Sequence, residues 1–430
     1  MGGMLETLRN ALKIPDLRKK IVMTVVMLLI FRIGAHIPVP GFNPEKFKTL
    51  IENGGSIAGF MDIISGGAFK QASIFAMSIT PYINASIIMQ LLTVAIPKLE
   101  QLQKEGEEGR KQIQKYVRYG TVLLGFIQAV GLYVTLSSAL TDDMGVLPFF
   151  TVTLTFTAGT AFLMWLGEKI NDVGIGNGIS LIIFAGILSR GPSAAMELYE
   201  LQKLDALGKG VISYFSIALI LASFIALIAG VVWVQQAERR IPVQYAKRVV
   251  GRKVYGGQNT HIPIKVNSAG VIPIIFAMSI IMFPATILQF FAPNADNWFI
   301  REALTPTGKI YALMYAILVI FFTFFYTVMV FNPVELSNNL KKNGGFIPGI
   351  RPGKPTSDYI AKILNRITWF NAFFLAFITV LPNVLSLIFD KIPNIWFAGT
   401  GLLIMVGVAL DTVKQIESQM LMRHYKGFLE

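Results

Sequence analysis

The sequence predicts an all-α membrane protein, and three observations support this fold class. Hydrophobic residues make up 53% of the 430-residue chain and charged residues only 15%, whereas soluble domains carry about 25% charged residues. Apolar runs close to the length of a bilayer crossing recur along the chain, and Lys and Arg gather in every second gap between them. Because lipid cannot hydrogen-bond a bare backbone, such runs are expected to form transmembrane helices.

Ten transmembrane helices are expected. They cover residues 21–37, 73–96, 119–140, 148–167, 177–190, 212–236, 269–291, 310–332, 368–389 and 394–411. We expect the first to be retained, because the basic segment before it resembles the start of a signal peptide but no small-residue cleavage site follows. Division of ten spans into five and five suggests two pseudo-symmetric inverted halves, residues 1–200 and 201–430.

The distribution of positive charge predicts the orientation of the chain. Alternate segments, beginning with the N-terminal one, hold 28 of the 38 Lys and Arg residues, while the other gaps hold 9 and Arg32 lies inside the first span. Since Lys and Arg accumulate on the cytoplasmic side, both termini are expected in the cytoplasm. The net charge of +13 favours acidic partners, namely anionic lipid, an acidic protein or RNA.

Two of the predicted cytoplasmic gaps are long and basic. In 237–268, the extended arms 241–247 and 260–266 flank a basic, glycine-rich tip, which predicts a β-hairpin. In 333–367, the density of Pro and Gly favours a shaped loop over a helix. The basic residues of both gaps could contact lipid and enforce topology, or they could bind an acidic protein or ribosomal RNA phosphates.

No arrangement of residues typical of catalysis stands out, so we expect no enzymatic activity, no metal site and no cofactor. The chain has no cysteine and only three histidines, far apart in sequence. Gly174–Gly178 lacks the Lys and Ser/Thr of a phosphate-binding loop, and its glycines are expected to allow close helix packing. Arg32 is the one clear charge inside a span, and we interpret it as a side chain that snorkels or pairs structurally.

Segment 54–72 is too short and too interrupted by glycine to span a membrane, yet it is too apolar for a free external loop. Two structures fit these properties: a segment that folds back into a protein cavity, or a helix lying on the bilayer surface. Isoleucines are also abundant near the centres of the predicted spans. Most are expected to face lipid or core, but a converging minority would form an apolar constriction that blocks ions by dewetting.

Eight short stretches, taken together and in order, resemble a known family. They are Phe31–Gly34, Ile37–Gly41, Thr80–Ile88, Gly174–Ser180, Ala246–Arg248, Asn267–Pro273, Phe346–Gly353 and Gly399–Ile404. The chain resembles the SecY family over nearly its whole length. That resemblance implies a protein-conducting channel of the bacterial inner (plasma) membrane, which passes unfolded secretory polypeptides and releases apolar segments sideways into lipid.

The resemblance also implies four sets of site residues. The apolar pore ring maps onto Ile79, Ile83, Ile183, Ile187, Ile275 and Ile404. A re-entrant plug helix falls on Ile57–Phe69 and includes Phe60, Ile63, Ile64, Gly66, Gly67 and Phe69. The lateral gate lies between the second and seventh spans, at Ser86, Ile87, Gln90, Ile275 and Ser279. The cytoplasmic partner-binding residues are Arg240, Lys247, Arg248, Arg252 and Arg351.

The partners that the resemblance implies are the membrane subunits SecE and SecG, the motor ATPase SecA, the ribosome, membrane lipid and the translocating polypeptide. Two other hypotheses stay open from the residues alone. The five-plus-five layout would also suit a secondary transporter of a small solute, which predicts ionisable residues at mid-span. A scaffold or receptor whose basic loops recruit a soluble enzyme is the third.

Overall fold

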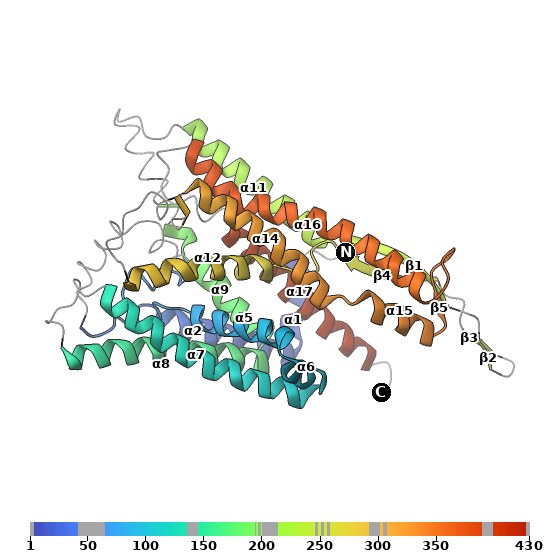
Figure 1. The fold of residues 1–430 in the computed structure, drawn as a ribbon, viewed down its shortest axis with the longest axis horizontal. Coiled ribbons are helices and arrows are strands. Elements are labelled where there is room, and N and C mark those ends of the chain that lie inside the picture. Colours follow the sequence, from blue (N-terminus) through green and yellow to red (C-terminus); the bar gives the residue numbers. More distant parts are fainter. Residues whose placement is uncertain are drawn as a thin grey trace.

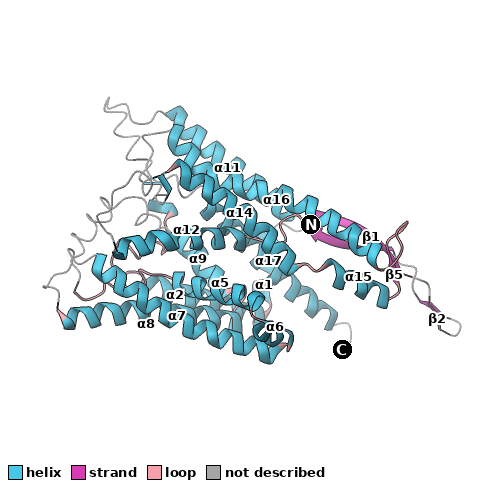
Figure 2. Cartoon of the chain, in the orientation of Figure 1, coloured by secondary structure: helices cyan, strands magenta, loops and turns pink. Residues whose placement is uncertain are grey.

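The computed structural model of the chain describes most of its residues. The described residues are 4–41, 65–135, 145–193, 195–196, 199, 214–245, 248–250, 253–255, 259–291, 302–303, 308–388 and 399–426. Helices dominate, and the strands lie together at one end of the molecule (Figure 2). This mainly helical architecture is the fold class that the sequence predicts.

Two groups of helices lie side by side with their axes roughly parallel (Figure 1). The N-terminal group consists of α1 (Met4–Lys13), α2 (Pro15–Gly34), α5 (Thr80–Ala95), α6 (Pro97–Lys104), α7 (Glu107–Thr135), α8 (Val146–Val173) and α9 (Gly178–Ser189). The C-terminal group consists of α11 (Tyr214–Gln236), α12 (Ile272–Phe291), α14 (Lys309–Val330), α15 (Pro333–Lys342), α16 (Lys354–Ile388) and α17 (Thr400–Lys426). A helix therefore falls on each of the ten predicted segments.

The two groups meet along two seams. On one seam α9 and α1 pack against α17, and on the other α5 and α7 pack against α12. Within the groups, α7 packs on α5 and α8, while α14 packs on α12 and α16. The helices α1, α5, α7, α9, α12 and α17 thus line the junction between the groups.

Hydropathy alone supports fewer complete spans than ten. Within the described residues, four helical segments are long and apolar enough to cross a membrane: α7, α8, α14 with α15, and α16. The bent pair of α5 and α6 would make a fifth if it counts as one span. The ten-span count therefore stays a prediction.

Prolines set where several helices begin. Pro15, Pro81, Pro97 and Pro333 occupy first-turn positions of α2, α5, α6 and α15, where a missing N–H breaks no helical hydrogen bond. Pro97 also forces the preceding residue into an extended conformation, and the chain bends by 102° between α5 and α6.

Two predicted boundaries are wrong. The second predicted span covers 73–96, but residues 65–79 form turns and the helix begins only at Thr80. The sequence predicts a shaped loop over 333–367, but most of this gap is helical, in α15 and the first turns of α16. Within this gap, only residues 343–353, where Pro and Gly are dense, are not helical. They include the two-residue strand β5 (Gly345–Phe346). Hydropathy located the apolar stretches correctly, but it did not report the backbone conformation of residues 73–79 or of the segments between the stretches.

A small sheet extends from the end of the bundle. Strand β1 (Glu238–Tyr245) pairs antiparallel with β4 (Asn259–Lys265) and with β5, and β2 (Arg248–Val250) pairs with β3 (Lys253–Tyr255) beyond them. The pairing of β1 with β4 matches the two arms expected from the sequence. Ile241, Val243 and Ile264 pack against α15 and α16 in a separate apolar core, so the sheet is fixed to the helices below it.

Glycines allow the N-terminal group to pack closely. A Cβ at Gly178 would collide with the carbonyl of Gly167 in α8, and a Cβ at Gly159 would collide with the carbonyl of Ile74. The prediction that the glycines around 174–178 permit close packing is therefore confirmed for Gly178. This closeness holds α9 and the turns before α5 against α8.

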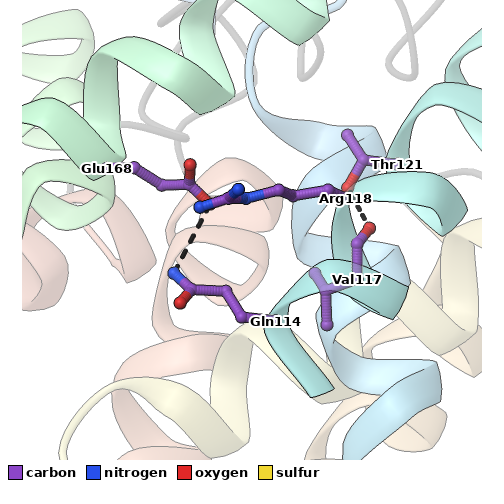
Figure 3. A network of polar contacts seen from close by, with 5 residues as sticks. All are labelled: Gln114, Val117, Arg118, Thr121 and Glu168. Carbon is purple, nitrogen blue, oxygen red and sulfur yellow. Dashed lines mark hydrogen bonds and ion pairs between the residues drawn. The ribbon is translucent and has the colours of Figure 1, made fainter. Parts of the chain in front are cut away.

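A polar network joins α7 to α8 (Figure 3). The Arg118 Nε atom donates to the Glu168 Oε1 atom at 2.8 Å, and Gln114 Nε2 donates to the same oxygen at 3.4 Å. The Glu168 side chain is only 13% exposed, whereas that of Arg118 is 49% exposed. The carboxylate therefore depends on the arginine more than the arginine depends on the carboxylate.

We expect Arg118→Ala to destabilise the protein by about 2 kcal/mol, because it leaves a mostly buried carboxylate with one long hydrogen bond. Glu168→Ala is expected to cost less, since the freed guanidinium is half-exposed. The measurement is the free energy of unfolding of each purified variant in detergent. Lys104→Ala, which breaks the exposed pair with Glu100, is the control and should change little. A larger cost for Glu168→Ala would contradict this interpretation.

Candidate functional site

The six predicted ring isoleucines meet in one apolar cluster at the junction of the two helix groups. Ile79, Ile183, Ile187 and Ile404 are buried in it, with exposures between 1% and 7%. Ile83 and Ile275 are half-buried and pack against both this cluster and the core of the C-terminal group. We call these six residues the waist.

Each waist residue comes from a helix that lines the junction or from its cap. Ile83 lies in α5, Ile275 in α12 and Ile404 in α17, while α9 contributes Ile183 and Ile187 from successive turns of one face. Ile79 is the N-cap residue of α5 rather than a residue within it. These side chains are branched at Cβ and carry no polar atom, so the cluster presents only stiff hydrocarbon surface.

A polar cavity of about 380 Å³ lies next to the waist, on the side of the sheet. Among its lining residues are Asn177, Gln235, Asn267, Asp411 and Lys414. Val271 and Val408 line the cavity and also pack in the apolar cluster of the waist. The cavity wall therefore includes both amide and charged groups and hydrocarbon of the apolar cluster.

The polar lining residues of this cavity did not emerge from the sequence as functional residues. They come from α9, α11, α17 and the turn after β4. Asn267 is 7% exposed, and its Oδ1 atom accepts a hydrogen bond from Asn371 Nδ2 in α16 at 3.2 Å, which fixes that turn. No signal in a single sequence links residues this far apart, although Asn267 lies in one of the stretches that carried the resemblance.

The predicted plug falls only partly within the described residues. Phe60, Ile63 and Ile64 lie outside them. Gly66, Gly67 and Phe69 belong to residues 65–79, which we call the strap. The described part of the predicted plug forms turns rather than a helix. Gly66 and Gly67 have φ of +68° and +87°, which glycine adopts without strain.

The strap is packed into the bundle and does not lie on its surface. Ala68 and Phe75 pack in the apolar cluster of the waist, while Phe69 and Met77 pack in a neighbouring cluster with Phe156 of α8. Of the two structures that the sequence left open for segment 54–72, a fold-back into the protein fits residues 65–72. Its irregular backbone is shielded by protein, as membrane depth requires.

The predicted gate residues lie where α5 faces α12. Ile87 is 4% exposed and packs with Ile274, Ala277 and other α12 residues. Ser86 and Gln90 in α5 and Ser279 in α12 are half-buried. The contact between these two helices closes one of the two seams between the helix groups.

The predicted partner-binding residues differ in what the structure describes. Arg240 in β1 is exposed and pairs with Glu238 at 2.7 Å. Arg351 is exposed in the loop between β5 and α16, where its carbonyl accepts a hydrogen bond from the Thr356 hydroxyl at 2.9 Å. Arg248 is in β2, and Lys247 and Arg252 lie outside the described residues. The side chains of Arg240 and Arg351 are thus exposed on the module formed by β1, β4, β5 and α15, which extends beyond the helix bundle.

Comparisons with known proteins identify the family of the chain. The family model for SecY matches residues 73–413. A protein translocase subunit SecY from Halalkalibacterium halodurans is 48% identical over 434 residues, which cover 99% of this chain and 100% of the relative.

Solved structures share the fold. A SecY channel structure, described as having a plug domain that stabilises the closed state, has a TM-score of 0.66 at 21% identity and matches 94% of this chain and 92% of its own. The canine Sec61 chain of a ribosome–channel complex has a TM-score of 0.63 at 21% identity, with the same coverage. On its sequence and over nearly its full length, the chain belongs to the SecY family.

Proposed function

We propose that this chain forms a protein-conducting channel, through which unfolded secretory polypeptides cross the membrane. The observation that carries the proposal is the waist, where six isoleucines from both helix groups meet below a polar cavity. The membership of the chain in the SecY family, in which the relative from Halalkalibacterium halodurans is named a protein translocase subunit, supports the same activity. The reaction is passage along a path, so the channel needs no cofactor or catalytic residue, and an energy source lies in a partner.

The channel is proposed to lie in the bacterial inner membrane as ten spans in two inverted halves, residues 1–200 and 201–430. Support comes from the helix on each predicted segment and from the two-group packing. Both termini, and the module of β1, β4, β5 and α15, are assigned to the cytoplasm. The excess of Lys and Arg in the corresponding segments supports that orientation.

The waist is proposed to act as a seal that parts for a threading chain. Isoleucine side chains have few rotamers and offer no hydrogen bonds, so a constriction made of them excludes water and ions but adapts to any extended polypeptide. The plug is assigned to 57–69, of which the strap contains residues 65–69.

Apolar segments in transit are proposed to leave through the seam of α5 and α12. Ile87 and the α12 residues that contact it provide an apolar seam, while Ser86, Gln90 and Ser279 add half-buried polar groups to it. Opening this seam would let an apolar segment gain burial in lipid, whereas a polar segment gains nothing by leaving.

The exposed basic module is proposed to bind the motor SecA or the ribosome, and SecE and SecG are proposed as membrane companions. Arg240 and Arg351 supply exposed guanidinium groups that suit carboxylates or RNA phosphates. A structural neighbour belongs to a complex with the ribosome. Secondary transport of a small solute is not favoured, because the waist is built from isoleucine alone and offers no group for ion coupling.

The direct test is reconstitution of the protein with SecE, SecG and SecA in proteoliposomes containing a secretory precursor and ATP. We expect the precursor to become protected from external protease. Precursor that stays accessible although SecA is bound would contradict conduction and leave only a scaffold role.

The waist makes a sharper prediction at Ile404. We expect Ile404→Asn to raise the ion leak of the idle channel several-fold, because an amide at the waist favours water there. Ile404→Val, which keeps a branched apolar side chain, is the matched control and should stay tight. The measurement is conductance across a planar bilayer without precursor. Equal conductance for the Asn and Val variants would show that the waist is not the seal.

Arg351 is expected to matter for the partner and not for the fold. Arg351→Glu should lower precursor translocation at least tenfold while leaving the melting temperature unchanged, because it reverses charge at an exposed position. Arg366→Glu, an exposed charge reversal further along α16, is the control. Normal translocation by the Arg351 variant would remove its assigned role.

A further inference from the structure

Arg32 is the charged residue that the sequence places inside the first span, and the structure gives it a specific partner. Its Nη1 atom donates to the carbonyl oxygen of Gly66, the second residue of the strap, at 2.7 Å. Among the residues that the structure describes, no carboxylate lies within ion-pair distance of this guanidinium. The expected structural pairing therefore exists, and it is made to backbone.

A second donor reaches the same carbonyl from another helix. The hydroxyl of Ser189, the last residue of α9, shares its one proton between Gly186 O at 2.7 Å and Gly66 O at 3.2 Å. A Cβ at Gly66 would lie 2.6 Å from the Cα of Gly186. The strap thus touches the backbone of α9, and its carbonyl is held from both α2 and α9.

The hydrogen bond from Arg32 to Gly66 O is stronger than a hydrogen bond between two backbone groups. A hydrogen bond from a guanidinium is charge-assisted, and a surrounding low dielectric strengthens it. The C-terminal end of α9 carries a negative partial charge, which favours a cation close by. A guanidinium at membrane depth is costly when unbonded, so Arg32 stabilises the strap in the position that satisfies it.

The strap is fixed a second time near its middle. The amide of Val39 donates to Ala72 O at 2.8 Å, and the amide of Ile74 donates to Ile37 O at 3.0 Å. These bonds hold residues 72–74 without help from Gly66. The contact at Gly66 therefore controls the part of the strap before this bridge, next to the α9 turns that carry Ile183 and Ile187.

We propose that Arg32 and Ser189 are positioning residues that hold Gly66 against α9 in the idle channel and release it when a polypeptide enters. This proposal rests on the proposed channel function. The two donors set how readily the strap leaves the waist, and breaking both bonds is part of opening. Arg32 acts through the strap and does not touch the passenger in the idle state.

The test uses Ser65→Cys as a probe, because Ser65 is fully buried in the strap and the chain has no cysteine of its own. The complex, with cysteine-free partners, is reconstituted in proteoliposomes without precursor, and the rate at which a small maleimide alkylates the introduced thiol is measured. The probe is combined with Arg32→Met, Arg32→Lys, Ser189→Ala and the control Ser193→Ala. Among the described residues, Ser193 donates only to the carbonyl of Arg190, beyond the end of α9.

We expect Arg32→Met to raise the alkylation rate about tenfold and Ser189→Ala about threefold, in keeping with a charged and a neutral hydrogen bond. Ser193→Ala should have no effect, and Arg32→Lys, which keeps a cationic donor, should restore most of the protection. If Arg32→Met fails to assemble, Ser189→Ala against Ser193→Ala decides the question.

Rates in the Arg32→Met and Ser189→Ala variants equal to that of Ser193→Ala would overturn the proposal. A lysine variant as reactive as the methionine variant would also overturn it. Precursor translocation by the Ser65→Cys protein is measured in parallel. Its absence would contradict the channel function, whereas normal translocation with unchanged alkylation would contradict only the role of Arg32 and Ser189.

Discussion

The structure depends on one constraint: every backbone polar group in a membrane-embedded bundle needs a partner inside the protein. Helices meet this requirement by themselves, but the strap at 65–79 does not, because it is built from turns. Turn hydrogen bonds within the strap, such as Ala72 N to Phe69 O, satisfy part of its backbone, and Arg32, Ser189 and the backbone at 37–39 supply further partners. Because these further partners come from other segments, the position of the strap depends on α2, on α9 and on residues 37–39.

This constraint connects the strap to the waist. Phe31, beside Arg32, and Phe75 of the strap stack with ring centroids 6.1 Å apart and belong to the same apolar cluster as the six isoleucines. Movement of α9, α12 or α17 therefore changes the surface on which the strap rests. A cavity lined by polar and apolar residues borders this cluster on the side of the sheet.

The sequence predicted the location of the helices well, since apolar length and charge alternation report exclusion from water directly. It also predicted that a minority of the isoleucines could converge, whereas the six positions came from family resemblance and not from spacing. Helix ends were less predictable. Residues 354–367 are helical outside the apolar stretch, because packing of Ile360 and Leu364 on the sheet stabilises them. Residues 73–79 are apolar but not helical, with Ala72 and Ser78 at positive φ.

Contacts between distant residues could not be predicted from one sequence. Gly66 and Gly186 are each ordinary glycines in the sequence, and only the fold brings their backbones together. The same holds for Asn267 and Asn371, whose amides meet beside the cavity. Arg32 was visible in the sequence as an unusual charge. Its partner is a backbone carbonyl, which every residue has, so the sequence does not show which residue provides it.

Disulfide trapping of a stalled precursor tests the central claim most directly, because the chain lacks cysteine. Single cysteines at Ile83, Ile275 and Ile404 would be compared with one at Ile88, an α5 residue that is 43% exposed. If the waist is the path, a cysteine in the stalled segment forms disulfides with the three waist positions and not with position 88. Cross-linking to position 88 alone would show that polypeptides do not pass through the waist.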